Sequence, residues 1–205
     1  MSNQLQTNTV KKGLTVKDLI IMGVFAALLT VCSMIGGIFF AITPTLTFYF
    51  SIGAALLPGP VFLLLLAKVP KRGALAIIGT IVAVLSLVLG MHWAMGLGGL
   101  IGSLLADMVA GTKKYRSKKM NILAYIVYSF GPTGTYFAYF IDPQTWASTM
   151  LKKGTTEDYI NAMNNTADWR VLVIMIVGTI LVAWLSGFIG SKLLKKQFEK
   201  AGIIA

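Results

Sequence analysis

The distribution of positive charge constrains the fold of this chain more than any other feature of its sequence. Fifteen of the 18 Lys and Arg residues fall into four clusters, at Lys11–Lys17, Lys68–Arg72, Lys113–Lys119 and Lys192–Lys200. The apolar stretches between these clusters have lengths that suit one membrane crossing or an out-and-back pair. Because positive residues concentrate on the cytoplasmic side of membrane proteins, the pattern predicts six crossings with both termini in the cytoplasm.

The composition agrees with a membrane protein and excludes several other classes. The mean hydropathy is +0.77, with 56% hydrophobic and only 12% charged residues, which is outside the usual range of soluble domains. Six crossings of about 20 residues take up roughly 120 residues, so no soluble catalytic domain fits. The net charge of +11 is explained by topology and by attraction to anionic lipids, and nucleic-acid binding is not expected.

Prolines and turn residues divide the apolar stretches into an all-α fold of six transmembrane helices. The expected bounds of these helices are 19–42, 46–67, 74–91, 94–110, 120–141 and 171–191. Segment 142–170 is expected to be an outer loop with a short interfacial helix that begins near Thr156, and residues 192–205 a basic cytoplasmic tail. We expect the breaks at Pro58-Gly59-Pro60 and Gly131-Pro132 to face protein or a cavity, because lipid cannot satisfy freed carbonyls.

The sequence lacks the motifs of an enzyme. It has no glycine-rich phosphate loop that ends in Lys-Ser or Lys-Thr, so this chain is not expected to hydrolyse ATP. It also has no His-Glu-x-x-His and no Gly-x-Ser-x-Gly. We therefore expect a protein without catalytic residues.

Asp107 is the one acidic residue within an apolar stretch. Ionisable groups in membrane helices are functional candidates, and Asp107 could couple a secondary transporter to protons. However, it lies only one to two turns from the cluster at Lys113–Lys119. A structural pairing with Lys113 or Arg116 is the alternative interpretation.

His92 is the only histidine and lies at an expected outer turn beside Met91 and Trp93. A neutral imidazole can bind a metal or haem iron, or donate a hydrogen bond to a polar ligand. The alternative is an interfacial histidine, with Trp93 in the aromatic belt of the membrane. The aromatic residues from Tyr136 to Phe140 are expected at the same outer end, where an aromatic cavity could hold a flat organic ligand.

Small residues at helical spacing form a candidate docking face on the first helix. Gly23 and Ala27 are four residues apart, and Ala26 lies alongside. Such faces allow close helix contacts in lipid, either within a bundle or with a partner protein.

Taken together, several segments make the chain resemble the substrate-binding S-components of energy-coupling factor (ECF) transporters, and among them the MptD or Trep_Strep group. The resemblance covers nearly the whole chain. The segments that carry it are Lys17-Asp18-Leu19-Ile20, the stretch from Leu66 to Gly73, Gly90 with His92-Trp93, Asn121 to Tyr125 with Gly131-Pro132, and the ending from Lys192 to Gly202.

The resemblance implies a six-helix bundle in the bacterial cell membrane that captures a vitamin or cofactor from outside. Such a subunit docks on an EcfT-like membrane scaffold that is driven by two ABC-type ATPases. Helix-1 residues Gly23, Ala26 and Ala27 are then expected to contact the scaffold. The chain itself is expected to hold no intrinsic cofactor.

Haem or a related tetrapyrrole is the best single candidate for the cargo that the resemblance implies. His92 would then be an axial ligand of the haem iron, with Met91, Met95 or Tyr136 as the sixth ligand. Trp93, Tyr136 and Tyr139 are expected to stack on the cargo. Other vitamins or precursors of pyridine, pyrimidine or flavin type remain open, as do a secondary transporter that uses Asp107 and a purely structural or regulatory membrane subunit.

Overall fold

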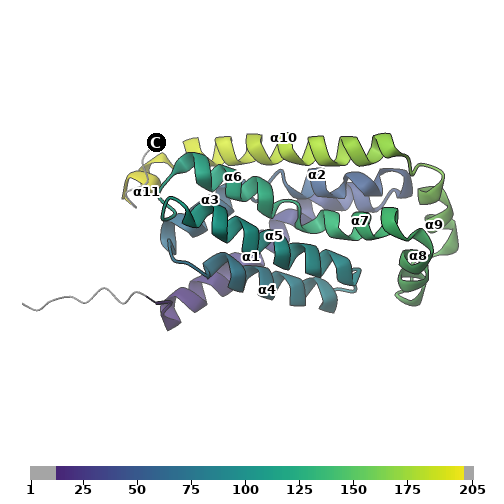
Figure 1. Ribbon diagram of the computed structural model, residues 1–205, viewed down its shortest axis with the longest axis horizontal. Helices are drawn as coiled ribbons and strands as arrows, with labels where there is room; N and C mark the ends of the chain where they lie inside the picture. Colours follow the sequence, from purple (N-terminus) through teal and green to yellow (C-terminus); the bar gives the residue numbers. More distant parts are fainter. Residues whose placement is uncertain (1–12, 201–205) are drawn as a thin grey trace, which may run out of the picture.

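The computed structural model describes residues 13–200, except for the side chains of Gln197, Phe198 and Lys200, and this part of the chain contains helices and no strand. Lys11 and the last residues of the expected basic tail lie outside it. The longest helices run along the molecule, and short helices cover one end (Figure 1). The helices are α1 (Val16–Ala41), η1 (Pro44–Tyr49), α2 (Phe50–Ala54), α3 (Gly59–Lys68), α4 (Ala74–Val88), α5 (Trp93–Gly111), α6 (Lys118–Tyr128), η2 (Gly131–Thr133), α7 (Gly134–Ile141), α8 (Pro143–Lys152), α9 (Glu157–Asn164), α10 (Trp169–Leu193) and α11 (Lys195–Lys200).

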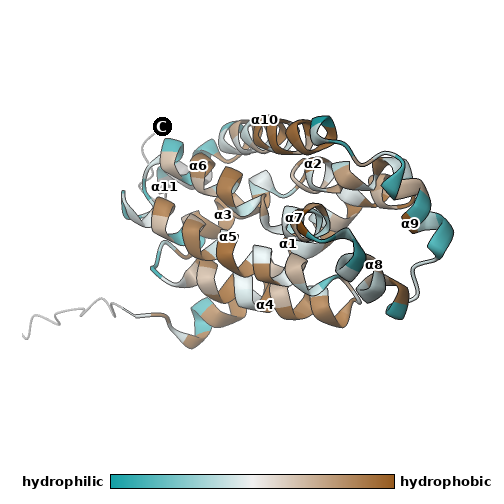
Figure 2. Ribbon diagram, turned by 45° about the vertical axis from the view of Figure 1, so that its right-hand side comes forward, coloured by the Kyte–Doolittle hydropathy of each residue, from teal (hydrophilic) through white to brown (hydrophobic). Residues whose placement is uncertain are grey.

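Four helical segments of the described chain are long and apolar enough to cross a membrane. They are Val16–Ala41, Pro44–Lys68, Trp93–Gly111 and Trp169–Leu193. The outer faces of these helices are apolar. Hydrophobic residues cover α4, α5 and α10, and hydrophilic residues lie mainly at the two ends of the molecule (Figure 2). A surface of this kind needs lipid around it. The chain is therefore an all-helical membrane protein, whereas six crossings and the side of the termini stay predictions.

The second expected helix, 46–67, is not continuous. It consists of η1, α2 and α3, and the break between α2 and α3 falls where Pro58 and Pro60 remove backbone donors. The Tyr125 hydroxyl donates to the freed carbonyl of Ala55 at 2.6 Å, and Gly59 N–H donates to Ser186 Oγ at 3.2 Å. As expected, the break faces protein and its polar groups are satisfied there.

The fifth expected helix, 120–141, is also interrupted. Helix α6 ends at Tyr128, the 3-10 turn η2 contains Pro132, and α7 continues to Ile141. This interruption packs directly against α5, where a Cβ on Gly98 would lie 2.6 Å from the carbonyl oxygen of Gly131. The small residues of α5 thus permit backbone contact between these helices.

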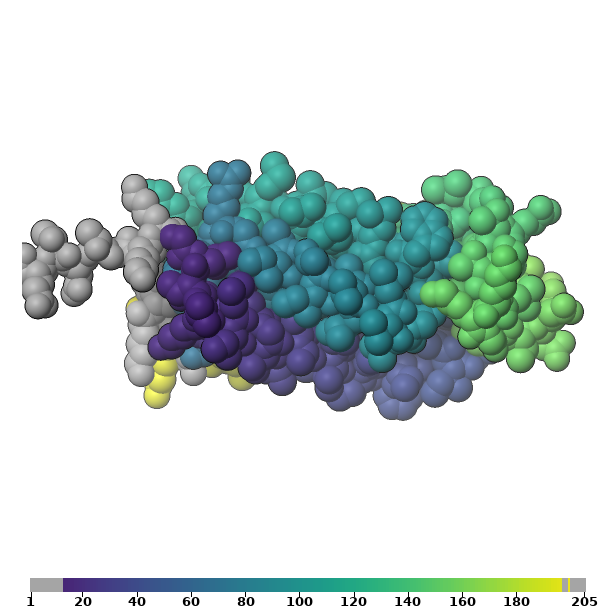
Figure 3. Space-filling model, turned by 90° about the horizontal axis from the view of Figure 1, so that it is seen from below, coloured from purple at the N-terminus to yellow at the C-terminus, as the bar shows by residue number. Residues whose placement is uncertain are grey.

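The segment 142–170 is not a loop with one short helix, because it contains two helices. Asp142 caps α8 by accepting a hydrogen bond from Thr145 N at 3.0 Å, and Pro143 occupies the first turn. Thr156 caps α9, which is the short helix expected from the sequence. Both helices lie at the end of the molecule opposite the start of α1 (Figure 3). We call this the cap end, and it also includes the α4–α5 turn, residues 89–92.

The opposite end carries the basic connections 69–73 and 112–117, together with the start of α1 and the end of α10 (Figure 1). We call it the basic end. Two separate hydrophobic clusters form the core. The larger is mainly aliphatic and includes Leu65, Leu66 and Leu75. The smaller contains the aromatic residues Phe48, Tyr136, Tyr139 and Trp146 and lies against the cap helices.

Candidate ligand-binding cavity

A cavity of about 530 Å³ lies at the cap end, between the bundle and helices α8 and α9. Its volume is within the range of sites for small organic molecules. The lining residues come from α1, η1, α2, the α4–α5 turn, α5, α7 and the cap segment: Met34, Ile38, Ala41, Thr47, Phe50, Met91, His92, Met95, Thr135, Tyr136, Trp146, Met150, Gly154, Thr155, Thr156 and Tyr159.

The chemistry of this lining is apolar, aromatic and nearly uncharged. Four methionines and four aromatic rings (Phe50, Tyr136, Trp146 and Tyr159) supply most of its bulk, and threonines supply hydroxyl groups. The lining contains no Asp, Glu, Lys or Arg, and His92 is its only titratable group apart from tyrosines. Such a surface suits a flat molecule that carries few polar groups and no strong net charge.

A second, smaller cavity of about 90 Å³ extends the lining toward the middle of the bundle. It shares Met34, Phe50, Met91 and Met95 with the larger cavity. Its far wall includes Tyr125 and Ser129, whose hydroxyls donate to the carbonyls of Ala55 and Tyr125. A ligand longer than the outer cavity could therefore reach past the shared methionines.

His92 is a structural part of the α5 start as well as a cavity residue. It is the N-cap of α5, and its Nδ1 accepts a hydrogen bond from Ala94 N at 3.2 Å. The ring is only 3% exposed and stacks on Trp146, with ring centroids 6.0 Å apart. Since Nδ1 is the acceptor, the proton of the neutral ring is on Nε2, which has no partner among the described residues.

The surroundings of His92 favour this neutral form. Burial lowers the pKa of His92 below its ordinary value, and the positive charge of Lys153 lowers it further. Protonation would also turn Nδ1 into a donor that faces the Ala94 N–H. His92 therefore presents a buried Nε2–H donor at neutral pH.

Four side-chain hydrogen bonds attach the cap segment to the bundle. Tyr159 OH donates to Ala41 O at 2.7 Å, and Trp146 Nε1 donates to Thr135 Oγ1 at 2.9 Å. Tyr139 OH donates to Asn164 Oδ1 at 2.6 Å, and Lys153 Nζ donates to the Met91 carbonyl. These bonds hold α8 and α9 over the cavity from several sides.

The structure brings together only some of the residues that the sequence suggested. Met91, His92 and Tyr136 line the cavity, whereas Trp93 is 53% exposed and lies outside it. Tyr139 is buried beneath the cap and bonds to Asn164, so it cannot stack on a ligand in this arrangement. Sequence reasoning missed the lining residues Phe50, Trp146, Met150 and Tyr159, together with the threonines.

Asp107 lies at the basic end, far from this cavity in the bundle. Its carboxylate accepts hydrogen bonds from Gly73 N at 2.9 Å, Leu75 N at 3.3 Å and Tyr115 OH at 3.2 Å. It forms no ion pair with Lys113 or Arg116 among the described side chains, which corrects the expected pairing. Instead, it binds the open amides at the start of α4, where Gly73 takes a left-handed φ of 88°.

The candidate docking residues of α1 divide into two groups. Gly23 and Ala27 are exposed, and a Cβ at Gly23 would meet no atom within 4 Å. Ala26 is fully buried in the core and is not available to a partner. The exposed small pair therefore consists of Gly23 and Ala27 alone.

Comparison with known proteins identifies a family but no characterised relative. The family model of a hypothetical bacterial integral membrane protein, Trep_Strep, matches residues 16–200. No curated protein and no solved structure matches the chain. The match extends over almost all of the chain and agrees with the apolar spanning helices. The chain thus belongs to the Trep_Strep family of bacterial integral membrane proteins.

Proposed function

We propose that this protein captures a small, flat and largely apolar molecule at its cap end, as the substrate-binding subunit of an ATP-driven ECF-type importer. The observation that carries the proposal is the cavity of about 530 Å³ beneath α8 and α9. By the positive-inside rule, the cap end faces the outside of the cell. The cavity is therefore placed to receive cargo before transport.

In this proposal, ATP-driven transport needs partners, because the sequence contains no phosphate-binding loop with which this chain could hydrolyse ATP. Two ATPases and a membrane scaffold would supply the energy and the movement. The exposed pair Gly23 and Ala27 on α1 supports a contact with the scaffold, since small residues let two helices approach closely in lipid. Only 22% of the apolar window of α1 is buried within this chain, so much of the helix is free for a partner.

The lining chemistry narrows the class of cargo. Rings of Phe50, Tyr136 and Trp146 can stack on a planar molecule. The Nε2–H of His92, unpartnered among the described residues, is closed off in this arrangement, and a small shift of the ring on binding would let it donate to an acceptor on the cargo. A pyridine, pyrimidine or flavin type of vitamin or precursor has this combination of planarity and acceptor atoms. This is the cargo class that the geometry supports best.

Haem remains a second candidate, because His92, Met91, Met95 and Tyr136 all line the same cavity. Nitrogen, thioether and phenol groups are known axial ligands of haem iron. Iron ligation through Nε2 would require the proton to move to Nδ1, which would break the bond from Ala94 N. Haem binding through His92 would thus remove the side-chain hydrogen bond that caps the start of α5.

Native mass spectrometry of the chain, expressed in a bacterial host and purified in detergent, tests the proposal. We expect one small molecule per chain, and tandem fragmentation would identify it. A titration with haem runs alongside, in the wild type and in His92→Ala. A sharp, saturable Soret band that is lost in the variant would identify haem as cargo, whereas a broad band identical in both would remove it.

The importer role has its own test once the cargo is known. Uptake into vesicles should require the ATPase partners and should stop when they are omitted. Uptake by this chain alone, driven by a proton gradient and abolished by Asp107→Asn, would instead identify a secondary transporter. If the chain binds no small molecule in native mass spectrometry, in the haem titration or in the uptake assay, it is a structural or regulatory subunit.

A further inference from the structure

A second large cavity lies at the basic end, on the outer surface of the bundle where α6 begins beside α10. It has a volume of about 660 Å³ and is an open groove that does not communicate with the cap-end lining, since the two share no residue. The residues that line it are Lys113, Arg116, Ser117, Lys118, Lys119, Ile122, Trp184 and Phe188. Nothing in the proposed capture of a cargo uses this groove.

The polar wall of the groove is strongly positive. Lys113, Arg116, Lys118 and Lys119 line it, and no acidic residue does. Within residues 13–200, ion pairs join Lys71 to Asp18, Arg170 to Asp168 and Lys195 to Glu199, and none involves a groove cation. Four like charges gathered without counter-charges repel one another, so an anion bound here would be stabilised.

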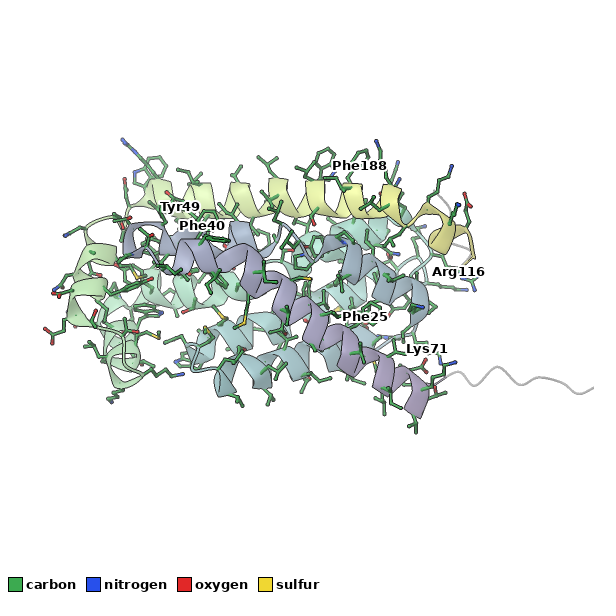
Figure 4. The ribbon with its side chains drawn as sticks, turned by 180° about the vertical axis from the view of Figure 1, so that it is seen from behind. Phe25, Phe40, Tyr49, Lys71, Arg116 and Phe188 are labelled. Carbon is green, nitrogen blue, oxygen red and sulfur yellow. The ribbon has the colours of Figure 1, made fainter. Side chains whose placement is uncertain are left out.

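The other wall is aromatic and faces the surroundings of the bundle. The rings of Trp184 and Phe188 stack with centroids 5.7 Å apart, and Trp184 is 50% exposed. The ammonium groups of Lys118 and Lys192 lie 5.8 Å and 4.5 Å from the centre of the Phe188 ring. Phe188 on α10 and Arg116 lie toward the same end of the molecule (Figure 4). The apolar wall belongs to α10, which is long and apolar enough to span a membrane, so we expect it to face lipid chains.

The basic connection that carries Lys113 and Arg116 is held in place by buried contacts. Lys114 and Tyr115 both adopt left-handed backbone conformations, with φ of 53° and 63°, which are costly for residues with side chains. Tyr115 is only 4% exposed and donates its hydroxyl to Asp107, while Asn121 Nδ2 donates to Tyr115 O at 2.9 Å. The strain is offset by these bonds, and the cations are thereby presented on an ordered turn.

We propose that this groove binds the phosphate headgroup of an anionic phospholipid. Arg116 and the lysines would contact the phosphate oxygens, and one acyl chain would lie along Trp184 and Phe188. Basic pockets beside membrane helices recognise acidic lipid headgroups in this way. Free phosphate would share the headgroup chemistry but would leave the exposed aromatic wall unused, so the geometry favours the lipid.

Lipid retention measured by native mass spectrometry tests this assignment. The detergent-purified full chain is mixed with phosphatidylglycerol, phosphatidylcholine or inorganic phosphate at equal concentrations. The groove variant is Arg116→Gln/Lys118→Gln/Lys119→Gln. The matched control, Lys17→Gln/Lys68→Gln/Arg72→Gln, removes the same number of charges from the same end but from residues outside the groove.

We expect the wild type and the control to retain phosphatidylglycerol roughly tenfold to a hundredfold better than phosphatidylcholine, because each basic contact favours an anionic headgroup. The groove variant should lose this preference. Trp184→Ala, a change at a lipid-exposed site, should weaken retention of phosphatidylglycerol by about threefold to tenfold through lost acyl contact. Thermal unfolding of each sample shows that the variants are folded.

Three results would overturn the assignment. An equal loss in the groove variant and the control would mean diffuse attraction to the basic end. Displacement of the lipid by equimolar inorganic phosphate would identify a phosphate site. Unchanged retention of phosphatidylglycerol in the groove variant would place the lipid site elsewhere on the protein.

Discussion

The two ends of the bundle use polar side chains in opposite ways. At the basic end, the buried carboxylate of Asp107 accepts bonds from the backbone of α4 and from Tyr115, and aliphatic side chains pack tightly around it. At the cap end, aromatic side chains surround a cavity, and single hydrogen bonds tie surface helices to the bundle. The basic end is tightly packed and hydrogen-bonded, whereas the cap end contains a cavity that can hold a small molecule.

This difference indicates where the molecule can move. Local opening is least costly where few buried contacts and single side-chain bonds hold an element. Helices α8 and α9 are closer to that description than the basic end, since they add only Trp146, Ile160 and Met163 to the smaller core cluster. The other ties are single bonds from Tyr159 and Lys153 to backbone carbonyls of α1 and of the α4–α5 turn. We therefore propose that the basic end anchors the structure and that a ligand enters at the cap end.

The largest expected effect comes from breaking the anchor with Asp107→Ala. The substitution leaves the Gly73 and Leu75 amides and the Tyr115 hydroxyl without their partner, which should cost about 2–4 kcal/mol of unfolding free energy. Thermal unfolding in detergent should show a clearly lower Tm. Asp107→Asn keeps an acceptor oxygen and should lose less. An unchanged Tm in Asp107→Ala would contradict the anchoring role.

The next effect separates the two roles of His92. His92→Asn keeps a side chain that can cap α5 but removes the imidazole, whereas His92→Ala removes both. We expect both variants to lose cargo affinity by about tenfold, and only His92→Ala to lose roughly 0.5–2 kcal/mol of stability. Native mass spectrometry and thermal unfolding of the same samples measure the two effects. Full affinity in His92→Asn would restrict His92 to capping.

A smaller effect should follow from loosening the cap. Tyr159→Phe removes the bond to the Ala41 carbonyl and little else, which is worth about 1 kcal/mol. Cargo dissociation, measured by displacement kinetics, should become roughly threefold to tenfold faster, and the Tm should fall by no more than about 2–4 °C. Slower cargo dissociation, or a large loss of Tm, would mean that Tyr159 stabilises the fold instead of closing the cavity.

The smallest expected effect is the pH dependence of stability that His92 contributes. Its pKa is lowered in the folded protein by burial and by Lys153, so the unfolded chain binds a proton first as the pH falls. The free energy of unfolding should therefore be at its full value above pH of about 6.5, the pKa of His in the unfolded chain. It should decline as the pH falls from there toward the lower pKa of His92 in the folded protein. His92→Asn should show a flatter Tm profile between pH 7 and pH 5. An equal slope in both proteins would exclude His92 as the source.

The sequence predicted the parts of the fold that follow from local chemistry. Apolar stretches between basic clusters gave the long helices, and prolines at positions 58 and 132 marked the breaks. Helix α8 was missed because its apolar content is low, although Asp142-Pro143 is a recognisable start signal. The expected helices 46–67 and 120–141 each contained a proline break, and the structure divides each stretch into separate helices at that break.

The sequence could not predict which side chains of the candidate site point into the cavity. His92 and Trp93 are adjacent, but the helix begins between them, so one ring turns toward Trp146 and the other to the outside. Tyr136 and Tyr139 lie one turn apart, yet only Tyr136 reaches the cavity. The sequence around Asp107 does not indicate that its carboxylate accepts bonds from Gly73 and Leu75, because these residues are distant in the chain. These choices depend on tertiary packing.

A crossed comparison of Asp107→Asn and His92→Asn tests the division between the two ends most directly. The fraction of chain that carries the co-purified small molecule is measured by native mass spectrometry, and the Tm is measured on the same samples. We predict that Asp107→Asn lowers the Tm and keeps the bound molecule, whereas His92→Asn keeps the Tm and loses the molecule. If both properties fall together in either variant, or if the effects are exchanged, the assignment of anchoring to one end and ligand capture to the other is contradicted.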